Sequence, residues 1–167
     1  MPQVTDRASS LTRRPLTGVR RIADGAFCYV AIVLVFGVLF QVYLAGVGIF
    51  GIDALSIANA KSFDDHRAWG FVLAMLAVVA LVLALVAREP RRMLTIAAVL
   101  VVLTVIAQSA LAALGEHNRW LGGLHALDGM AILLLSGWMA WLGRQRLRAR
   151  RNEAAPHAEE VRARDAA

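Results

Sequence analysis

Long apolar stretches alternate with short polar breaks along this chain. Each of the four longest stretches holds about 20 nearly uncharged residues, the length that an α-helix needs to cross roughly 30 Å of hydrocarbon. Helices are expected rather than strands, because an open strand would leave its backbone polar groups unpaired in lipid. The predicted fold class is therefore all-α, a four-helix transmembrane bundle with spans at about residues 26–50, 67–86, 93–114 and 121–142.

The polar segments divide the chain into three regions. We expect a basic tail at residues 1–21, a transmembrane domain at residues 22–143 and a charged tail at residues 144–167. From about Asn152 onward the sequence is rich in charge and alanine, which predicts a frayed helix or disorder. Between the second and third spans, Pro90 ends the helix and predicts a tight turn.

The composition supports a membrane protein and argues against nucleic-acid binding. The chain is 59% hydrophobic with a mean hydropathy of +0.60, which is too apolar for a soluble domain of 167 residues. Its net charge is +6, but the basic residues flank the apolar segments, where anionic lipid explains them. The single cysteine, Cys28, is expected to be a small packing residue.

The distribution of basic residues predicts the orientation. Fifteen arginines fall on one side of the predicted bilayer, in the two tails and the turn after the second span. The positive-inside rule places that side, and so both termini, in the cytoplasm of a bacterial plasma membrane. Trp69 and Trp120 would mark the outer interface and Trp141 the inner one. The basic residues on the outer side are Lys61, Arg67 and Arg119.

A polar pattern occurs twice. The first span ends in QVYLAGVG at residues 41–48 and the third in QSALAALG at residues 108–115, so that Gln, Leu, Ala and Gly recur at the same offsets. Each segment is followed by a helix that opens with His-x-x-x-Gly. Polar residues inside a membrane are rare and costly, so this match is informative. It predicts two helical hairpins that are parallel repeats, related by a pseudo-twofold axis along the membrane normal.

The two repeated histidines, His66 and His125, are the candidate metal ligands. Two neutral imidazoles, one from each hairpin, suit a flat cofactor with two axial positions, and haem iron accepts axial histidine. A four-helix bundle can supply such ligands from facing helices. The sequence therefore predicts haem b held between His66 and His125 near the outer face.

Six further residues complete the candidate cofactor site. The two glutamines are expected to form hydrogen bonds between helices around the cofactor. The two glycines, one turn after each histidine, would admit a macrocycle or simply let helices approach closely. The two arginines are at the level where they would meet haem propionates or anchor the interface. These residues are Gln41, Gln108, Gly70, Gly129, Arg67 and Arg119.

Asp128 lies three residues after His125, on the same face of its helix. It could stay protonated, pair with Arg67 or Arg119, orient His125 as a hydrogen-bond acceptor, or relay protons. By contrast, Glu116 and His117 fall in a short outer loop and are expected to be solvated.

Four motifs of this chain resemble one four-helix half of haem A synthase, over about residues 26–142. They are QVYLAG at residues 41–46, HRAWG at 66–70, QSALAAL at 108–114 and the His-x-x-x-Gly motif at 125–129. They also resemble a family of short, uncharacterised bacterial four-helix membrane proteins. The resemblance to haem A synthase implies that His66 and His125 occupy its haem-ligand positions. The glutamate that precedes the first histidine in that family's substrate half is missing here, as is its outer-loop cysteine pair. The match is therefore to the half that holds haem b as a cofactor. In the short-protein family, Pro and Asn follow the second histidine, where this chain has Ala126 and Asp128.

The function expected from this pattern is electron transfer rather than an enzymatic reaction. The protein would exchange one electron with a redox partner protein or a quinone. The principal alternative is a non-catalytic membrane scaffold or assembly subunit without cofactor. A further alternative is a divalent metal or quinone site that uses His66, His125 and Asp128. The sequence does not predict an oligomeric state.

Overall fold

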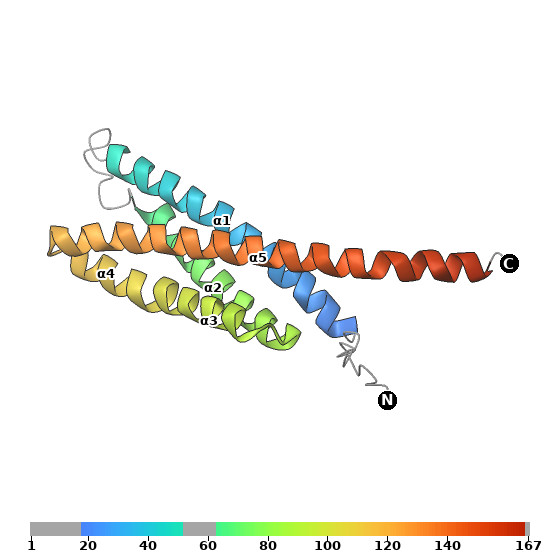
Figure 1. Cartoon of the computed structure of the whole chain (residues 1–167). Helices are drawn as coiled ribbons and strands as arrows, with labels where there is room; N and C mark the ends of the chain where they lie inside the picture. Colours follow the sequence, from blue (N-terminus) through green and yellow to red (C-terminus); the bar gives the residue numbers. More distant parts are fainter. Residues whose placement is uncertain (1–17, 52–62, 166–167) are drawn as a thin grey trace, which may run out of the picture.

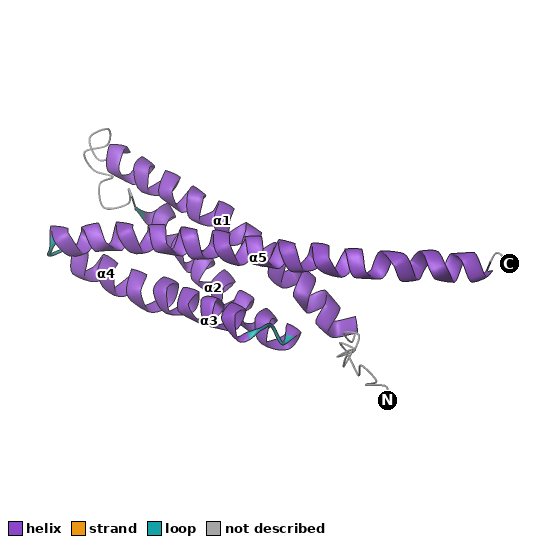
Figure 2. Ribbon diagram, in the orientation of Figure 1, coloured by secondary structure: helices purple, strands orange, loops and turns teal. Residues whose placement is uncertain are grey.

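The structure, a computed structural model, describes residues 18–51 and 63–165, with side chains for residues 18–50 and 63–152. These residues are almost entirely helical, and no strand occurs among them (Figure 2). The elements are α1 (Gly18–Gly51), α2 (Asp64–Ala87), α3 (Arg91–Val101), the π-helix η2 (Val102–Ala107), α4 (Gln108–Gly115) and α5 (Arg119–Asp165). Because α3, η2 and α4 follow one another without a break, we call Arg91–Gly115 the third helix.

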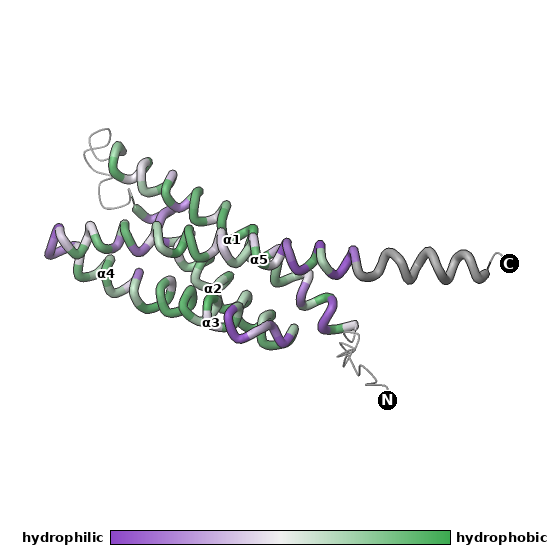
Figure 3. Tube along the Cα trace, in the orientation of Figure 1, coloured by the Kyte–Doolittle hydropathy of each residue, from purple (hydrophilic) through white to green (hydrophobic). Residues whose placement is uncertain are grey.

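The four predicted membrane spans are confirmed as helices. Each predicted span lies inside one of four helices that are long and apolar enough to cross a bilayer. Hydrophobic residues dominate the middle of these helices, and hydrophilic residues gather toward both ends of the bundle (Figure 3). These helices are Gly18–Phe50, Asp64–Ala87, Arg91–Gly115 and Arg119–Asn152.

Two helices extend beyond the predicted spans. α1 already begins at Gly18, inside the predicted N-terminal tail, and α5 continues to Asp165 through the predicted C-terminal tail. Arginine and alanine are strong helix formers, so a helix can continue after the hydrocarbon ends. In Figure 1 the C-terminal part of α5 projects well past the other helices. The polar outer segment between α1 and α2 falls largely outside the described residues.

Each helix packs mainly against two neighbours. α1 lies against α2 and α5, and the third helix also lies against α2 and α5. α2 and α5 therefore occupy opposite corners of the bundle (Figure 1). This arrangement matches the two predicted hairpins, one made of α1 and α2 and the other of the third helix and α5. It also places the two histidine-bearing helices across the central axis from each other.

The tightest packing lies in the half of the bundle away from the histidines. The α2 side of this core consists of alanines one or two turns apart, Ala77, Ala80 and Ala84, which let the neighbouring helices approach closely. Large side chains fill the space opposite these alanines. At the other end of the bundle, no residue of α4 is buried. The largest fully buried hydrophobic side chains are Phe27, Leu34, Leu100 and Met139.

The outer surface of the bundle is apolar as well. Phe36, Phe71 and Leu134 are each at least 64% exposed, and they come from three different helices. So much exposed hydrophobic surface would be a liability in water, but it suits contact with lipid chains. The structure thus indicates a multi-pass membrane protein.

The predicted tight turn after α2 is confirmed. Arg88 adopts the left-handed conformation with φ 56°. Its N–H donates to the Leu85 carbonyl, and the N–H of Glu89 donates to the Ala84 carbonyl. This is the Schellman pattern, which satisfies the last carbonyls of a helix. Pro90 then caps α3, where its fixed φ suits a helix start.

Two buried carboxylates fasten the C-terminal part of α5 to the bundle. Arg146 pairs with Glu89 in the turn after α2, and Arg150 pairs with Asp24 of α1. The side chains of Glu89 and Asp24 are only 1% and 7% exposed. Arg146 and Arg150 are four residues apart, so both point from the same face of α5. Sequence analysis treated these arginines only as orientation signals and missed their structural role.

Replacing Arg146 with methionine tests the first of these pairs. The substitution keeps an apolar stem of similar length but leaves the Glu89 carboxylate buried without this charged partner. We expect the free energy of unfolding to fall by about 3 kcal/mol, as for other broken buried pairs. Thermal unfolding in detergent, followed by circular dichroism, measures the change.

Arg148→Met is the matched control, because Arg148 is exposed on the opposite face of α5. It should change the stability by no more than about 0.5 kcal/mol. The double variant Glu89→Gln/Arg146→Met should regain most of the loss. Equal destabilisation by Arg146→Met and Arg148→Met would contradict a specific pair.

Candidate functional site

In the first hairpin, Gln41 of α1 and His66 of α2 form a reciprocal pair. The Gln41 side-chain amide donates to the backbone carbonyl of His66, with Nε2 and O 2.9 Å apart. The His66 ring nitrogen Nδ1 lies 3.2 Å from the backbone carbonyl oxygen of Gln41. Each side chain thus bonds the backbone of the other residue and ties the two helices together.

The second hairpin repeats this arrangement with Gln108 and His125. Gln108 Nε2 donates to the His125 carbonyl at 3.1 Å, and His125 Nδ1 lies 3.2 Å from the Gln108 carbonyl oxygen. The same atoms are joined at nearly the same distances in both hairpins. The predicted repeat is therefore present in the hydrogen bonding as well as in the sequence. We call these two arrangements the Gln–His pairs.

The Gln–His pairs determine which nitrogen of each histidine is available for other partners. A carbonyl oxygen can only accept a hydrogen bond, so Nδ1 of His66 and of His125 must carry the proton. In the neutral ring the other nitrogen, Nε2, then keeps its lone pair. A ring held by Nδ1 and free at Nε2 is the usual state of a histidine that ligates a metal.

The two histidine rings lie next to each other across the centre of the bundle. Their centroids are 6.2 Å apart, and their planes are inclined by 57°. Two imidazoles bound on opposite sides of one metal ion, each by a bond of about 2 Å, have centroids roughly 6 Å apart. The observed separation would let both rings contact one bound group, and it also lies in the ordinary range for neighbouring aromatic rings. Neither ring is fully buried, and Phe63 lies edge-on to His66.

The two candidate glycines lie against the Gln–His pairs. A Cβ atom on Gly70 would lie 3.4 Å from Gln41 Nε2, and one on Gly129 would lie 3.5 Å from Gln108 Nε2. Both distances are ordinary van der Waals contacts, so a methyl group would fit at either position. The glycines thus occupy equivalent places in the two repeats, and admitting a macrocycle stays a prediction for them.

The π-helix η2 corrects a difference in register between the repeats. The buried residues of α1 recur in the third helix 66 positions later, whereas Gln41 and Gln108 are 67 positions apart. The third helix thus has one additional residue between its buried face and its glutamine. A π-helical turn accommodates such an insertion. The matched buried residues are Phe27, Ala31, Leu34 and Val38 in α1, with Met93, Ala97, Leu100 and Thr104 in the third helix.

Sequence analysis missed η2 and its buried Thr104. The Thr104 hydroxyl donates to the Leu100 carbonyl at 2.7 Å, so its polar group is satisfied within its own helix. The sequence does contain a sign of the inserted residue, because the apolar core positions and the glutamines of the two repeats are separated by different numbers of residues. Detecting this difference requires that the core positions be aligned separately from the polar ones.

The repeats differ three residues after each histidine. The first hairpin has Trp69, whose indole N–H donates to the Gly37 carbonyl at 2.9 Å. Trp69 packs against the core and edge-on against Phe40, so it joins α2 to α1 and does not serve as an exposed interface anchor. The second hairpin has Asp128 at the equivalent position.

Asp128 does not orient His125, contrary to one of the roles considered for it. The acceptor for His125 Nδ1 is the Gln108 carbonyl. The Asp128 carboxyl group lies beside His125 and interacts with the Gln108 side chain, while its Oδ2 is buried without a hydrogen-bond partner. Gln41 Oε1 is also buried without a partner. Ser136 Oγ, in the tightly packed half of the bundle, is in the same state, so this feature is not confined to the histidine end.

The two candidate arginines lie at the same end of the bundle. Arg67 is 3.5 Å from Glu116, a pair in which both side chains are more than half exposed. This contact links the two hairpins, although such surface pairs contribute little stability. The Arg119 guanidinium lies 5.3 Å from the centre of the Trp120 ring. Within the described residues, no ion pair joins Asp128 to either arginine.

The alternative metal site of His66, His125 and Asp128 is not supported. Among residues 18–51 and 63–165, no three histidine, cysteine, aspartate or glutamate side chains are grouped so that they could hold a metal ion. The histidines therefore stay candidate ligands only for a group that brings its other metal ligands with it.

Comparison with known sequences finds one family. Residues 41–114 match a family of unknown function (DUF6220). The matched region covers less than half of the chain, and it includes Gln41, His66 and Gln108 but ends before His125. No curated protein and no solved structure matches the chain. The resemblance to haem A synthase therefore stays a prediction.

Replacing either glutamine with leucine tests the Gln–His pairs. Gln41→Leu and Gln108→Leu each remove one hydrogen bond between helices, and we expect each to lower the free energy of unfolding by about 0.6–1.7 kcal/mol. The loss of the bond to the histidine carbonyl should be similar in both variants, and Gln108→Leu also removes the interaction with Asp128. Thermal unfolding in detergent measures them, with the exposed Gln145→Leu as control. An effect confined to one glutamine would contradict the equivalence.

Deleting one residue tests the role of η2. Removing the exposed Ile106 should convert η2 to a regular α-helix and give the third helix the register of α1, so the protein should keep most of its stability. Removing Leu39 from α1 should instead rotate Gln41 by about 100° away from His66. Thermal unfolding compares the two deletions. Equal damage from both would show that η2 does not correct the register.

Proposed function

We propose that this protein is a membrane cytochrome that holds one haem b between His66 and His125 and transfers electrons. The observation that carries the proposal is the 6.2 Å separation of the two rings, each of which is held by Nδ1 and has Nε2 free. A histidine that only joins two helices by a hydrogen bond uses one ring nitrogen. Two symmetry-related rings with the same nitrogen unused favour a shared ligand between them.

The residues around the rings fit this role. The Gln41 and Gln108 carbonyls fix the orientation of the rings and make Nε2 a better donor to iron. His66 and His125 would hold the haem, whose iron would supply one-electron transfer. The half-exposed site and the absence of buried residues in α4 mean that this end of the bundle is less tightly packed than the other.

Arg67 and Arg119 are the candidate partners for the haem propionates. Arg67 directly follows His66, and Arg119 begins α5, six residues before His125. Guanidinium groups bind carboxylates by paired, charge-assisted hydrogen bonds. The present partner of Arg67 is an exposed glutamate, which a propionate could replace at small cost.

The resemblance to the cofactor half of haem A synthase supports the same assignment. The residues that carry it, Gln41, His66, Gln108 and His125, are those that form the two Gln–His pairs. The glutamate of that family's substrate half is missing from this chain, which favours electron transfer over haem oxidation.

The charge pattern supports an orientation in the membrane. We propose that both termini lie in the cytoplasm and that the histidines lie near the outer face of a bacterial plasma membrane. A redox protein or a quinone would then exchange electrons with the haem at that face.

A scaffold or assembly role without cofactor is the second candidate. It is favoured by the fact that the Gln–His pairs already satisfy the histidine Nδ1 atoms and the glutamine amide groups as bonds between helices. It gives no reason for the adjacent histidine rings.

Absorption spectroscopy of the detergent-purified protein tests the proposal. After expression with haem supplementation, the protein should show a Soret band and, on reduction, the sharp α-band of a six-coordinate haem b. His66→Ala and His125→Ala should each lose most of the bound haem, because each removes one of only two protein ligands. His117→Ala, which changes an exposed histidine outside the site, is the matched control.

The scaffold alternative makes the opposite prediction. It expects no Soret band in any form, and normal expression and folding of the double variant His66→Ala/His125→Ala. A full Soret band in His125→Ala would also contradict bis-histidine ligation.

A further inference from the structure

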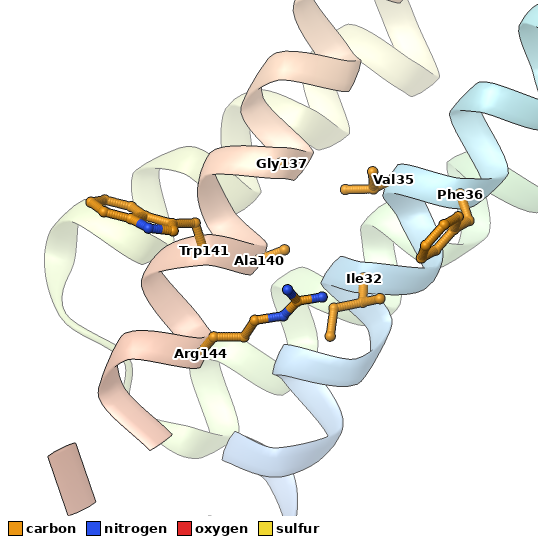
Figure 4. A pocket seen from close by; sticks show the side chains of 7 residues that line it. All are labelled: Ile32, Val35, Phe36, Gly137, Ala140, Trp141 and Arg144. Atoms are coloured by element: carbon orange, nitrogen blue, oxygen red, sulfur yellow. The ribbon is translucent and has the colours of Figure 1, made fainter. Parts of the chain in front are cut away.

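A groove between α1 and α5 opens to the exterior of the bundle, toward the end away from the histidines. Its volume is about 190 Å³. Ile32, Val35 and Phe36 line it from α1, while Gly137 and Ala140 form its floor on α5 (Figure 4). The walls are therefore apolar, and the exposed Phe36 shows that the groove faces the surroundings of the bundle.

One end of the groove is positively charged. Arg144 of α5 lines it, and Figure 4 shows the guanidinium group reaching across toward Ile32. Within the described residues, no carboxylate forms an ion pair with Arg144. The site thus combines an apolar channel with one unneutralised cation at its polar end.

The neighbouring arginines show that this charge is not a general property of α5. Arg146 and Arg150 face the bundle and are neutralised by Glu89 and Asp24. Arg144 lies on another face, together with Arg148 one turn further on, and both are exposed. The side of α5 that borders the groove therefore keeps its positive charge where the apolar span ends.

Gly137 keeps the groove open. A Cβ atom added at this glycine would meet nothing within 4 Å, in contrast to Gly37, where it would lie 2.6 Å from Leu73. Gly137 therefore does not serve close contact between helices. Its effect is to leave space at the centre of the groove.

We propose that this groove binds one anionic phospholipid, with part of an acyl chain against Gly137 and Ala140 and the headgroup phosphate on Arg144. The apolar walls match a chain, and the guanidinium group matches a phosphate, which arginine binds by paired hydrogen bonds. The groove lies on the surface of two membrane-spanning helices, where lipid is the surrounding solvent.

The proposal does not depend on haem binding. Ala140 is 15 residues beyond His125 on the same helix, about 22 Å along its axis. A ligand in the groove is therefore remote from the histidine rings. Loss of one site should leave the other intact.

Native mass spectrometry of the full-length protein in detergent tests the proposal. The protein is titrated with phosphatidylglycerol and, separately, with phosphatidylcholine of the same acyl chains. We expect one phosphatidylglycerol molecule to bind at a lower concentration than phosphatidylcholine. Arg144→Gln should weaken phosphatidylglycerol binding roughly fivefold, the effect of one arginine at an anionic membrane surface, and remove the preference.

Variants of Gly137 test the apolar part of the site. Gly137→Leu should fill the groove and abolish tight binding of both lipids, and Gly137→Ala should have an intermediate effect. Gly46→Leu is the matched control, because a Cβ atom there also meets nothing within 4 Å but lies outside the groove. Circular dichroism verifies that each variant is folded.

Three results would overturn the proposal. The first is equal affinity of the wild-type protein for the two lipids. The second is unchanged binding in Gly137→Leu. The third is an equal loss in Arg144→Gln and Arg151→Gln, because Arg151 is exposed but outside the groove, and equal losses would indicate general attraction to basic residues.

Discussion

The reciprocal hydrogen bonds between glutamine and histidine determine the arrangement of the half of the bundle that holds the histidines. In lipid, a polar side chain without a partner is costly, so each Gln41–His66 and Gln108–His125 contact holds its hairpin in one register. The same bonds require the ring proton on Nδ1, so that Nε2 carries the lone pair in each neutral ring. A single interaction, used twice, therefore joins the helices and sets the tautomer of both imidazoles.

The two halves of the bundle differ in how tightly they are packed. Away from the histidines, alanines of α2 and large apolar side chains pack tightly, and the buried pairs of Glu89 and Asp24 hold α5 in place. Near the histidines the packing is looser, and no residue of α4 is buried. Buried polar atoms without a hydrogen-bond partner occur in both halves, for example Gln41 Oε1 near the histidines and Ser136 Oγ in the tightly packed core.

The spans and the Gln–His repeat could be predicted from sequence because both depend on residue type and spacing alone. The length of each apolar stretch predicts a membrane-spanning helix. Polar residues such as His66 and His125 are rare inside a membrane, so their recurrence at matching positions stands out in the sequence. The π-helix and the pairing of Glu89 with Arg146 could not be predicted in this way. They depend on which faces of distant helices meet, and an arginine near the membrane has the same sequence signal whether it is exposed or paired.

Electron paramagnetic resonance of the oxidised protein tests the central claim most directly. The account predicts a low-spin ferric signal from one haem per chain with two axial imidazoles, because the free Nε2 atoms of His66 and His125 would bind the same iron. A purely high-spin signal would mean that only one histidine binds. The absence of any haem signal from folded, haem-supplemented protein would contradict the account altogether.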